Sequence, residues 1–356
     1  MIVYISYICL LFFLMVIDQF KQFNKNKSIL SNQYIHNKFS IAMKIAIIVT
    51  ISLSVFRYDI GWDYMGYYET ITDNRVTNIL LNREYFTIIL IFLARVLGSP
   101  YLYFAINTLI CICLIVLTVR KYSKDYWISI IFFITFPLFF LNSLSVIRNF
   151  TAIAIIFYGF MYIENKKFIK YLLIVLVASL FHKSAIIALV FYFLKDLKFK
   201  KDVYIAVLMI APLLSNLLNI IIINFLPNYE VYTKVSNTQQ GTKAILIVIF
   251  VVTVSIILRD RLTKQTAIFN VYFNIYFAGV CIYLAFYRQG TLGHRLSLYG
   301  TIFMLLIIPD IINLFKKKWD IIIIKAFFYV LCIAMFFYTI YVGSETYIPY
   351  KTFFTH

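Results

Sequence analysis

Apolar runs long enough to cross a lipid bilayer recur from one end of the chain to the other. A membrane span needs about 20 apolar residues in a helix, because every backbone polar group must be hydrogen-bonded within the segment. The sequence is 63% hydrophobic and only 13% charged, whereas soluble domains are about 45–50% apolar and about 25% charged. We place the runs at about 3–18, 41–56, 101–119, 125–141, 149–163, 168–181, 185–194, 203–226, 244–258, 267–287, 297–315 and 321–341.

The fold class follows from these runs. The chain is predicted to be an all-α, polytopic transmembrane helical bundle with about 11–13 membrane helices, some of them short and re-entrant. No polar stretch is long enough for a separate soluble domain, so residues 1–356 are expected to form a single integral membrane domain. The five cysteines all lie inside apolar runs. Their placement indicates neither a metal site nor a disulfide framework, and no cofactor is expected.

Basic residues fix the expected orientation. The net charge is +18, but it is concentrated in short loops, which is typical of cytoplasmic loops rather than of a nucleic-acid surface. Six such loops near residues 21–44, 120–124, 166–170, 195–201, 259–264 and 316–318 carry 21 of the 33 basic residues. Placing them all in the cytoplasm predicts that both termini and five other loops face outward. These outer loops lie at about 57–84, 142–149, 182–184, 227–243 and 287–296.

Two segments do not fit full spans. The stretch 85–97 ends at Gly98-Ser99-Pro100, and counting it as a span would turn the loop at 120–124 outward. We interpret it as a re-entrant or interfacial helix on the outer side. The pair 168–181 and 185–194 is also short, so His182 is expected at the tip of a hairpin that dips into the membrane.

Unusual charges gather on the predicted outer side. The first outer loop contains five of the fifteen carboxylates, including Asp59, Asp63 and Glu84. Three arginines, Arg148, Arg288 and Arg295, lie in other outer turns, and Arg57 is a fourth candidate. Arginine binds phosphate oxygens bidentately and keeps its charge when partly buried. Convergence of these groups would suit a lipid-linked pyrophosphate as substrate.

Several of the candidate residues also have a purely structural explanation. A lone arginine near a span end often reaches to lipid headgroups. Tyr64 and Tyr67 are typical of the interfacial aromatic belt, or they form platforms on which a sugar stacks. His182 fits a satisfied structural histidine, and Asp59 is placed to pair with Arg57. The sequence shows no metal-ligand spacing, phosphate loop or nucleophile elbow.

Four separated motifs resemble the EpsG-type family of exopolysaccharide polymerases, relatives of the Wzy polymerases of O-antigen and capsule. The opening motif is Arg57-x-x-Ile60-Gly61-x-Asp63-Tyr64-x-x-Tyr67, with Glu84 beginning the next helix. The second is Ile147-Arg148, followed by Asn149 where the family pattern leads us to expect Gln. The third is Ala178-x-x-Phe181-His182-x-Ser184, and the last combines Arg295 with Tyr299.

The resemblance implies a GT-C-like membrane glycosyltransferase on the outer face of the bacterial inner membrane, facing the periplasm or cell exterior. It would join undecaprenyl-pyrophosphate-linked oligosaccharide repeat units within the lipid bilayer, without nucleic acid as a partner. A chain-length regulator and a flippase of the same pathway are candidate partners. Displacement at an anomeric carbon needs a clamp on the leaving pyrophosphate and a base on the acceptor hydroxyl.

Roles are assigned to twelve residues on this hypothesis. Arg148, Arg288 and Arg295 are expected to form the clamp, so no metal would be required. We favour Asp63 as the base, with His182 as the alternative. Substrate binding is assigned to a wider group of residues: Arg57, Asp59, Tyr64, Tyr67, Glu84, His294 and Tyr299.

Three other functions remain open: a flippase for lipid-linked oligosaccharide, a glycan ligase and an O-acyltransferase. A transporter should carry charges at mid-membrane and internal inverted repeats. The mid-span positions here are mostly apolar, and no repeat is visible. Ligase and polymerase are distinguished only by the resemblance.

Overall fold

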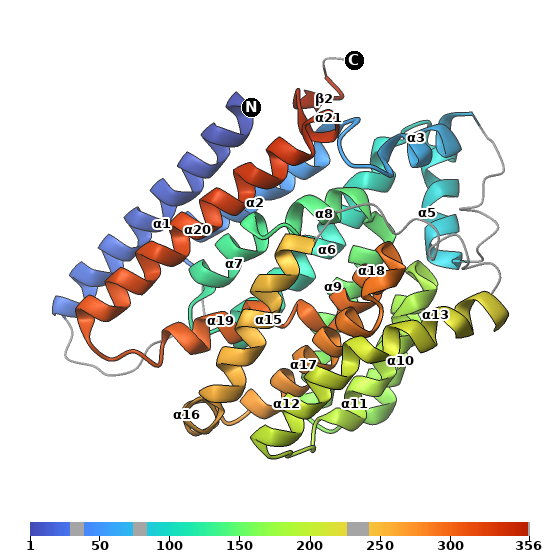
Figure 1. Ribbon diagram of the computed structural model, residues 1–356. Helices are drawn as coiled ribbons and strands as arrows, with labels where there is room; N and C mark the ends of the chain where they lie inside the picture. The colour runs from blue at the N-terminus through green and yellow to red at the C-terminus, as the bar shows by residue number, and fades with distance from the viewer. Residues whose placement is uncertain (29–38, 74–83, 226–241, 355–356) are drawn as a thin grey trace. The chain divides into compact units, whose positions relative to one another are not determined.

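Helices make up nearly all of the computed structural model, which describes residues 1–28, 39–73, 84–225 and 242–354 (Figure 1). Among these residues the only strands are β1 (Arg57–Tyr58) and β2 (Lys351–Thr352), which pair antiparallel. The predicted all-α fold is therefore confirmed. The chain divides into two compact units, residues 1–154 with 325–356, and residues 155–324. The expectation of a single membrane domain stays a prediction.

The first unit contains the N-terminal helices and the end of the chain. Its elements are α1 (Ile2–Ser28), α2 (Ile41–Val55), β1, α3 (Tyr64–Thr72), α5 (Tyr85–Val96), α6 (Tyr101–Tyr122), α7 (Tyr126–Thr135), α8 (Phe140–Ser145), the start of α9 (Ile147–Glu164), most of α20 (Lys318–Val342), α21 (Ser344–Tyr347) and β2. Helices α1, α2 and α20 run side by side (Figure 1).

The second unit contains the middle of the chain. Its elements are the rest of α9, α10 (Phe168–Phe181), the 3-10 helix η1 (Lys183–Val190), α11 (Phe191–Leu194), α12 (Lys201–Ile210), η2 (Ala211–Leu213), α13 (Leu214–Phe225), α15 (Thr242–Ile257), α16 (Arg259–Gln265), α17 (Phe269–Ala285), η4 (Tyr287–Gln289), α18 (Thr291–Thr301) and α19 (Met304–Ile312).

The helices have the lengths of a multi-pass membrane protein. Four described segments, 2–21, 101–122, 201–220 and 319–342, are long and apolar enough to cross a bilayer, and the bent pair α18–α19 would make a fifth. Seven more apolar helices in the described part of the chain have 10–17 residues. The helix α5, of 12 residues, has the shortness expected of a re-entrant or interfacial segment.

Several predicted spans are interrupted where the backbone cannot continue a helix. The run at 125–141 stops at Phe136, which is extended before Pro137, because proline disfavours the helical conformation of the residue before it. The run at 203–226 passes through the short 3-10 helix η2, which contains Pro212. The run at 297–315 bends by 54° between α18 and α19.

In the first unit, segments predicted to be outside lie together. The backbone N–H of Trp62 donates to Ser145 Oγ at 3.2 Å, and β1 pairs with β2 near the C-terminus. Helix α6 starts here, with Tyr101 stacked on Phe353. Its 22 residues span about 33 Å, so its other end lies far away.

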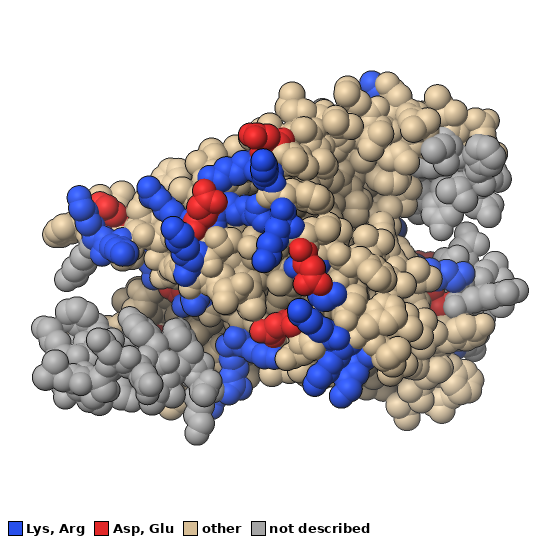
Figure 2. Space-filling view, turned by 90° about the horizontal axis from the view of Figure 1, so that it is seen from below, with Lys and Arg blue, Asp and Glu red and all other residues tan. Residues whose placement is uncertain are grey.

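The opposite end of the first unit carries segments predicted to be cytoplasmic. Arg120, near the end of α6, lies over the ring of Phe39. Lys325 Nζ lies 2.7 Å from Asp125 Oδ2. In the second unit, Lys201 pairs with Asp260 at 2.6 Å, and both residues belong to loops that are predicted to be cytoplasmic. Figure 2 shows Lys and Arg side chains gathered on the face that it draws.

Candidate functional site

Arg57 anchors the opening motif from inside the first unit. Its side chain is buried, with 1% exposure. It donates to the carbonyl oxygens of Ser54 and Ile60, and its guanidinium lies 5.7 Å from the ring centroid of Tyr64. Burial lowers the pKa of Arg57 to about 10, although nearby tyrosines oppose this shift. This placement suits a residue that positions the loop better than one that binds a diphosphate.

Gly61 brings the motif into contact with the segment before Arg148. Its backbone has φ +105°, and a Cβ here would lie 2.2 Å from the carbonyl oxygen of Leu144. Only glycine combines this conformation with such a close approach. The next residue, Trp62, donates its backbone N–H to Ser145. The first and second motifs are therefore held together by backbone contacts.

A charged cluster forms where three helices begin. Glu84 immediately precedes α5, and Arg148 lies in the first turn of α9. Arg148 Nη1 donates to Glu84 Oε2, and both side chains are largely buried, with exposures of 15% and 3%. The Arg148 guanidinium lies 5.6 Å from the ring centroid of Tyr67 in α3. We call these three residues with Asp63 the Glu84–Arg148 cluster.

Asp63 is included in this cluster because its charge acts on Tyr67. It precedes α3, and its carbonyl accepts from the backbone N–H of Tyr67. Burial raises the pKa of Tyr67 to about 12; the Arg148 charge opposes this shift, whereas the carboxylates of Asp63 and Glu84 add to it. All three charges therefore act on the same tyrosine. The sequence assigned roles to these residues, and the structure brings them together.

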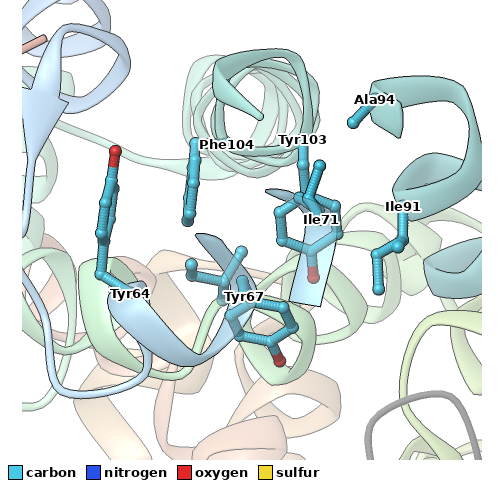
Figure 3. Close-up of a cluster of buried hydrophobic side chains, with 8 residues drawn as sticks. Tyr64, Tyr67, Ile71, Ile91, Ala94, Tyr103 and Phe104 are labelled. Atoms are coloured by element: carbon cyan, nitrogen blue, oxygen red, sulfur yellow. The ribbon is translucent and has the colours of Figure 1, made fainter. Parts of the chain in front are cut away.

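The tyrosines of the motif are core residues. Tyr64 stacks on Phe104 with centroids 4.1 Å apart, and Tyr67 stacks on Tyr103 at 4.9 Å. Figure 3 shows these rings packed between α3 and α6. Tyr64 and Tyr67 have exposures of 0% and 2%, so neither presents a face on which a sugar can stack. Trp62 is 56% exposed, and the sequence analysis predicted no role for it.

Asp59 pairs with the C-terminal segment instead of with Arg57. Its φ is +51°, a left-handed conformation that Asp tolerates better than most residues. Asp59 Oδ2 lies 3.2 Å from Lys351 Nζ, and Tyr350 OH donates to the carbonyl oxygen of Leu53 at 2.6 Å. Together with the pairing of β1 and β2, these contacts of residues 350–352 fasten the end of the chain to the opening motif, and we call them the C-terminal clasp. No feature of the sequence predicted it.

The third and fourth motifs meet in the second unit. His182 ends α10 in an extended conformation, and η1 follows directly. Helix α10 and η1 pack against each other, with Tyr171 OH donating to the carbonyl oxygen of Ala188 at 2.7 Å. The predicted hairpin is thus present, although its depth in the membrane stays a prediction. Ser184 Oγ lies 3.1 Å from the hydroxyl of buried Tyr299.

The glycine-containing turn places Arg288 beside α13. Arg288 is exposed, its Nη1 donates to Asn216 Oδ1, and its Nε donates to Tyr287 OH at 3.0 Å. The turn reverses at Gly290, which has φ +49°. Arg295 and His294 follow in the first turns of α18, where the imidazole of His294 packs edge-on against Tyr283.

The other predicted features are only partly covered by the structure. The outer loop at about 227–243 and residues 74–83 of the first outer loop lie largely outside the described residues. Within the described ranges, no group of three or more His, Cys, Asp or Glu side chains could hold a metal ion. Metal independence stays a prediction.

Comparison with known proteins gives one match. The model of the EpsG family matches residues 40–352, which include all four motifs. No curated protein and no solved structure matches the chain. The match covers nearly the whole chain and agrees with the helical, multi-pass architecture. The chain therefore belongs to the EpsG family, which makes it a membrane protein of the exopolysaccharide-polymerase type.

Proposed function

We propose that the protein polymerises lipid-linked oligosaccharide repeat units on the outer face of the bacterial inner membrane. The acceptor hydroxyl oxygen attacks the anomeric carbon of the donor glycan, and the bond from that carbon to the diphosphate oxygen breaks. The acceptor proton passes to a base, and the polyprenyl diphosphate leaves as an anion. The reaction needs no oxidant, no reductant and no substrate besides the donor and the acceptor.

The Glu84–Arg148 cluster is the observation that carries this proposal. It combines a carboxylate, a guanidinium held by a second carboxylate, and a buried tyrosine, all in segments of the first two motifs. An arginine has five N–H donors, so pairing with one carboxylate oxygen leaves it able to bind an anion as well. We assign proton acceptance to Asp63, with His182 as the alternative, and diphosphate binding to Arg148.

Arg288 and Arg295 are proposed as further diphosphate ligands. Arg288 is exposed in a turn beside α13, and Arg295 lies one helical turn before Tyr299. Tyr299 and Ser184 are proposed to hold the hairpin that bears His182 in place. Three other proposed positioning residues are Arg57, Tyr64 and Tyr67, because they are buried.

The test is the length distribution of surface glycan in a deletion strain that expresses single variants at equal membrane levels. We expect Asp63→Asn and Arg148→Ala to leave glycan of one repeat unit. Loss of a general base costs about 10²–10⁴-fold in rate, and loss of a donor to the developing negative charge costs about 10²–10³-fold. Arg261→Ala, in the cytoplasmic basic loop, is the control and should give the wild-type ladder. A full ladder from both site variants would contradict these roles.

Two further results separate the alternatives. Loss of even the single-unit glycan on deletion would place the step before polymerisation, as expected of a flippase. Transfer of one preformed block to a different acceptor would identify a ligase. Polymerisation should continue with a chelator present, and strict dependence on a divalent ion would overturn the arginine-based clamp.

A further inference from the structure

An open apolar groove lies in the second unit among α12, η2, α13 and α17. Its volume is about 340 Å³, which falls in the range of ligand pockets in proteins. Leu214 and Leu218 of α13 line one side, and Ala285 and Phe286 at the end of α17 line another. Two of the lining residues, Ile210 and Leu214, are 53% and 42% exposed, so the groove is open to the surface of the unit.

Polar groups border this groove on α13 and η4. Asn216, between Leu214 and Leu218, accepts from Arg288, and Arg288 follows Phe286 of the groove wall by two residues. The amide nitrogen of Gln289 donates to the carbonyl oxygen of Ser215 at 3.2 Å. A cation and several polar side chains therefore adjoin an otherwise apolar surface.

Ser215 and Gln289 each have one polar side-chain atom without a hydrogen-bond partner among the described residues. Ser215 and Gln289 are 1% and 0% exposed, and neither Ser215 Oγ nor Gln289 Oε1 is bonded. A buried polar atom without a partner costs about 1–3 kcal/mol. These two side chains lie in the buried contact between α13 and η4, and neither lines the groove.

We propose that the groove binds the isoprenoid chain of a lipid-linked diphosphate, with the diphosphate held by Arg288 at its edge. This inference rests on the proposed function and assigns part of its substrate to one place. The apolar walls suit a hydrocarbon chain, and the exposed guanidinium of Arg288 suits the diphosphate oxygens.

The direct test uses geranylgeranyl diphosphate with a photoreactive group at the end of its chain. The purified full-length protein in lipid nanodiscs is irradiated, and labelled peptides are identified by mass spectrometry. We expect labelling within residues 207–218 and 281–286, competed by unlabelled geranylgeranyl diphosphate but not by phosphatidylglycerol. Equal competition by phosphatidylglycerol would show that the groove holds bulk lipid and would overturn the proposal.

A matched pair of substitutions on α13 sharpens the test. Leu218→Trp fills the groove, whereas Leu217→Trp changes a neighbour that is 54% exposed and does not line it. Leu218→Trp should reduce probe affinity about tenfold, the loss expected when two methylene groups are excluded from apolar contact. Leu217→Trp should bind as wild type does. Equal affinities of the two variants would refute the groove assignment.

The outcome also separates the groove from the proposed function. Polymer formation by Leu218→Trp should require a higher concentration of the long-chain donor, with little change for a donor whose lipid is shortened to geranyl. Wild-type protein that binds the probe in the groove but never lengthens a glycan would reject the polymerase function and keep the binding site. Polymerisation with unchanged donor dependence in Leu218→Trp would reject the binding site alone.

Discussion

At the scale of single residues, two ion pairs of the first unit differ in burial. Arg148 and Glu84 have side-chain exposures of 15% and 3%, whereas Lys351 and Asp59 have exposures of 36% and 41%. Removing one partner of a buried pair leaves an uncompensated charge and costs about 3–5 kcal/mol. An exposed pair contributes about 0–1 kcal/mol.

We therefore predict that Glu84→Gln destabilises the protein much more than Asp59→Asn does. The measurement is thermal unfolding in detergent, followed by the loss of monodisperse protein in size-exclusion chromatography. Adding Arg148→Gln to Glu84→Gln should restore part of the stability, because the unpaired charge is removed. Equal unfolding temperatures for Glu84→Gln and Asp59→Asn would show that the buried pair does not hold the cluster.

From the sequence we predicted several charged residues that lie close together in the structure, but not the surroundings of each side chain. Asp63, Glu84 and Arg148 were predicted to be functional charges, and in the structure all three act on the pKa of Tyr67. The burial of Arg57 was missed, because a one-dimensional pattern does not show which carbonyl groups surround a side chain. The pairing of Asp59 with Lys351 was missed for a similar reason, since the partners are 292 residues apart.

At the scale of elements, helices α17 and α18 of the second unit approach each other closely at two glycines, Gly279 and Gly300. A Cβ on Gly300 would lie 2.6 Å from Gly279 Cα and 2.6 Å from the carbonyl oxygen of Ile275. Both obstacles are backbone atoms, so the helices would have to move apart. Helix α18 carries Arg295 and Tyr299, and its position therefore fixes the fourth motif.

Gly300→Ala should consequently lower both stability and polymerisation. Overpacking typically costs about 1–3 kcal/mol, and here it also shifts Tyr299 away from Ser184. Gly66→Ala in α3 is the control, because a Cβ there meets nothing within 4 Å and the substitution favours the helix. The comparison is made by unfolding temperature and glycan length, and wild-type behaviour of Gly300→Ala would contradict the observed packing.

The C-terminal clasp is a second contact between elements that can be tested. Removing residues 344–356 eliminates β2, the Asp59–Lys351 pair and the stacking of Phe353 on Tyr101. We predict faster hydrogen exchange in residues 57–63, because strand β1 loses its partner. Removing only residues 355–356 is the control. Unchanged exchange in the larger deletion would show that the clasp does not hold the opening motif.

Element boundaries followed from sequence where the cause of the break was local. The run at 168–181 matches α10 in full, and Pro137 and Pro212 lie at the interruptions of two other runs. The sequence did not predict the bend between α18 and α19, because the apolar run at 297–315 continues through it. Bends of this kind depend on packing against other helices.

At the scale of the whole molecule, the basic loops predict which segments face the cytoplasm. Within each unit, the segments predicted to share a side lie at the same end. We predict that Trp62→Cys and Tyr287→Cys, each in a cysteine-free background, react with a membrane-impermeant maleimide added to intact cells. Both side chains are exposed, at 56% and 49%.

Lys166→Cys and Arg261→Cys, in the same background, should react only after the membrane is made permeable. Both positions lie in basic loops assigned to the cytoplasm. Labelling in the reverse pattern would invert the orientation and place the Glu84–Arg148 cluster on the cytoplasmic side. The proposed polymerisation on the outer face would then be excluded.

The proposed reaction lengthens a lipid-linked glycan by transferring it from a diphosphate carrier. It can be measured with the purified protein in proteoliposomes that contain lipid-linked repeat units from the same cells, by following glycan length and released lipid diphosphate together. We predict a ladder of lengths, with one lipid diphosphate released for each unit added, and loss of both products in Asp63→Asn and Arg148→Ala. A ladder without release of lipid diphosphate, or no lengthening by the wild-type protein, would contradict it.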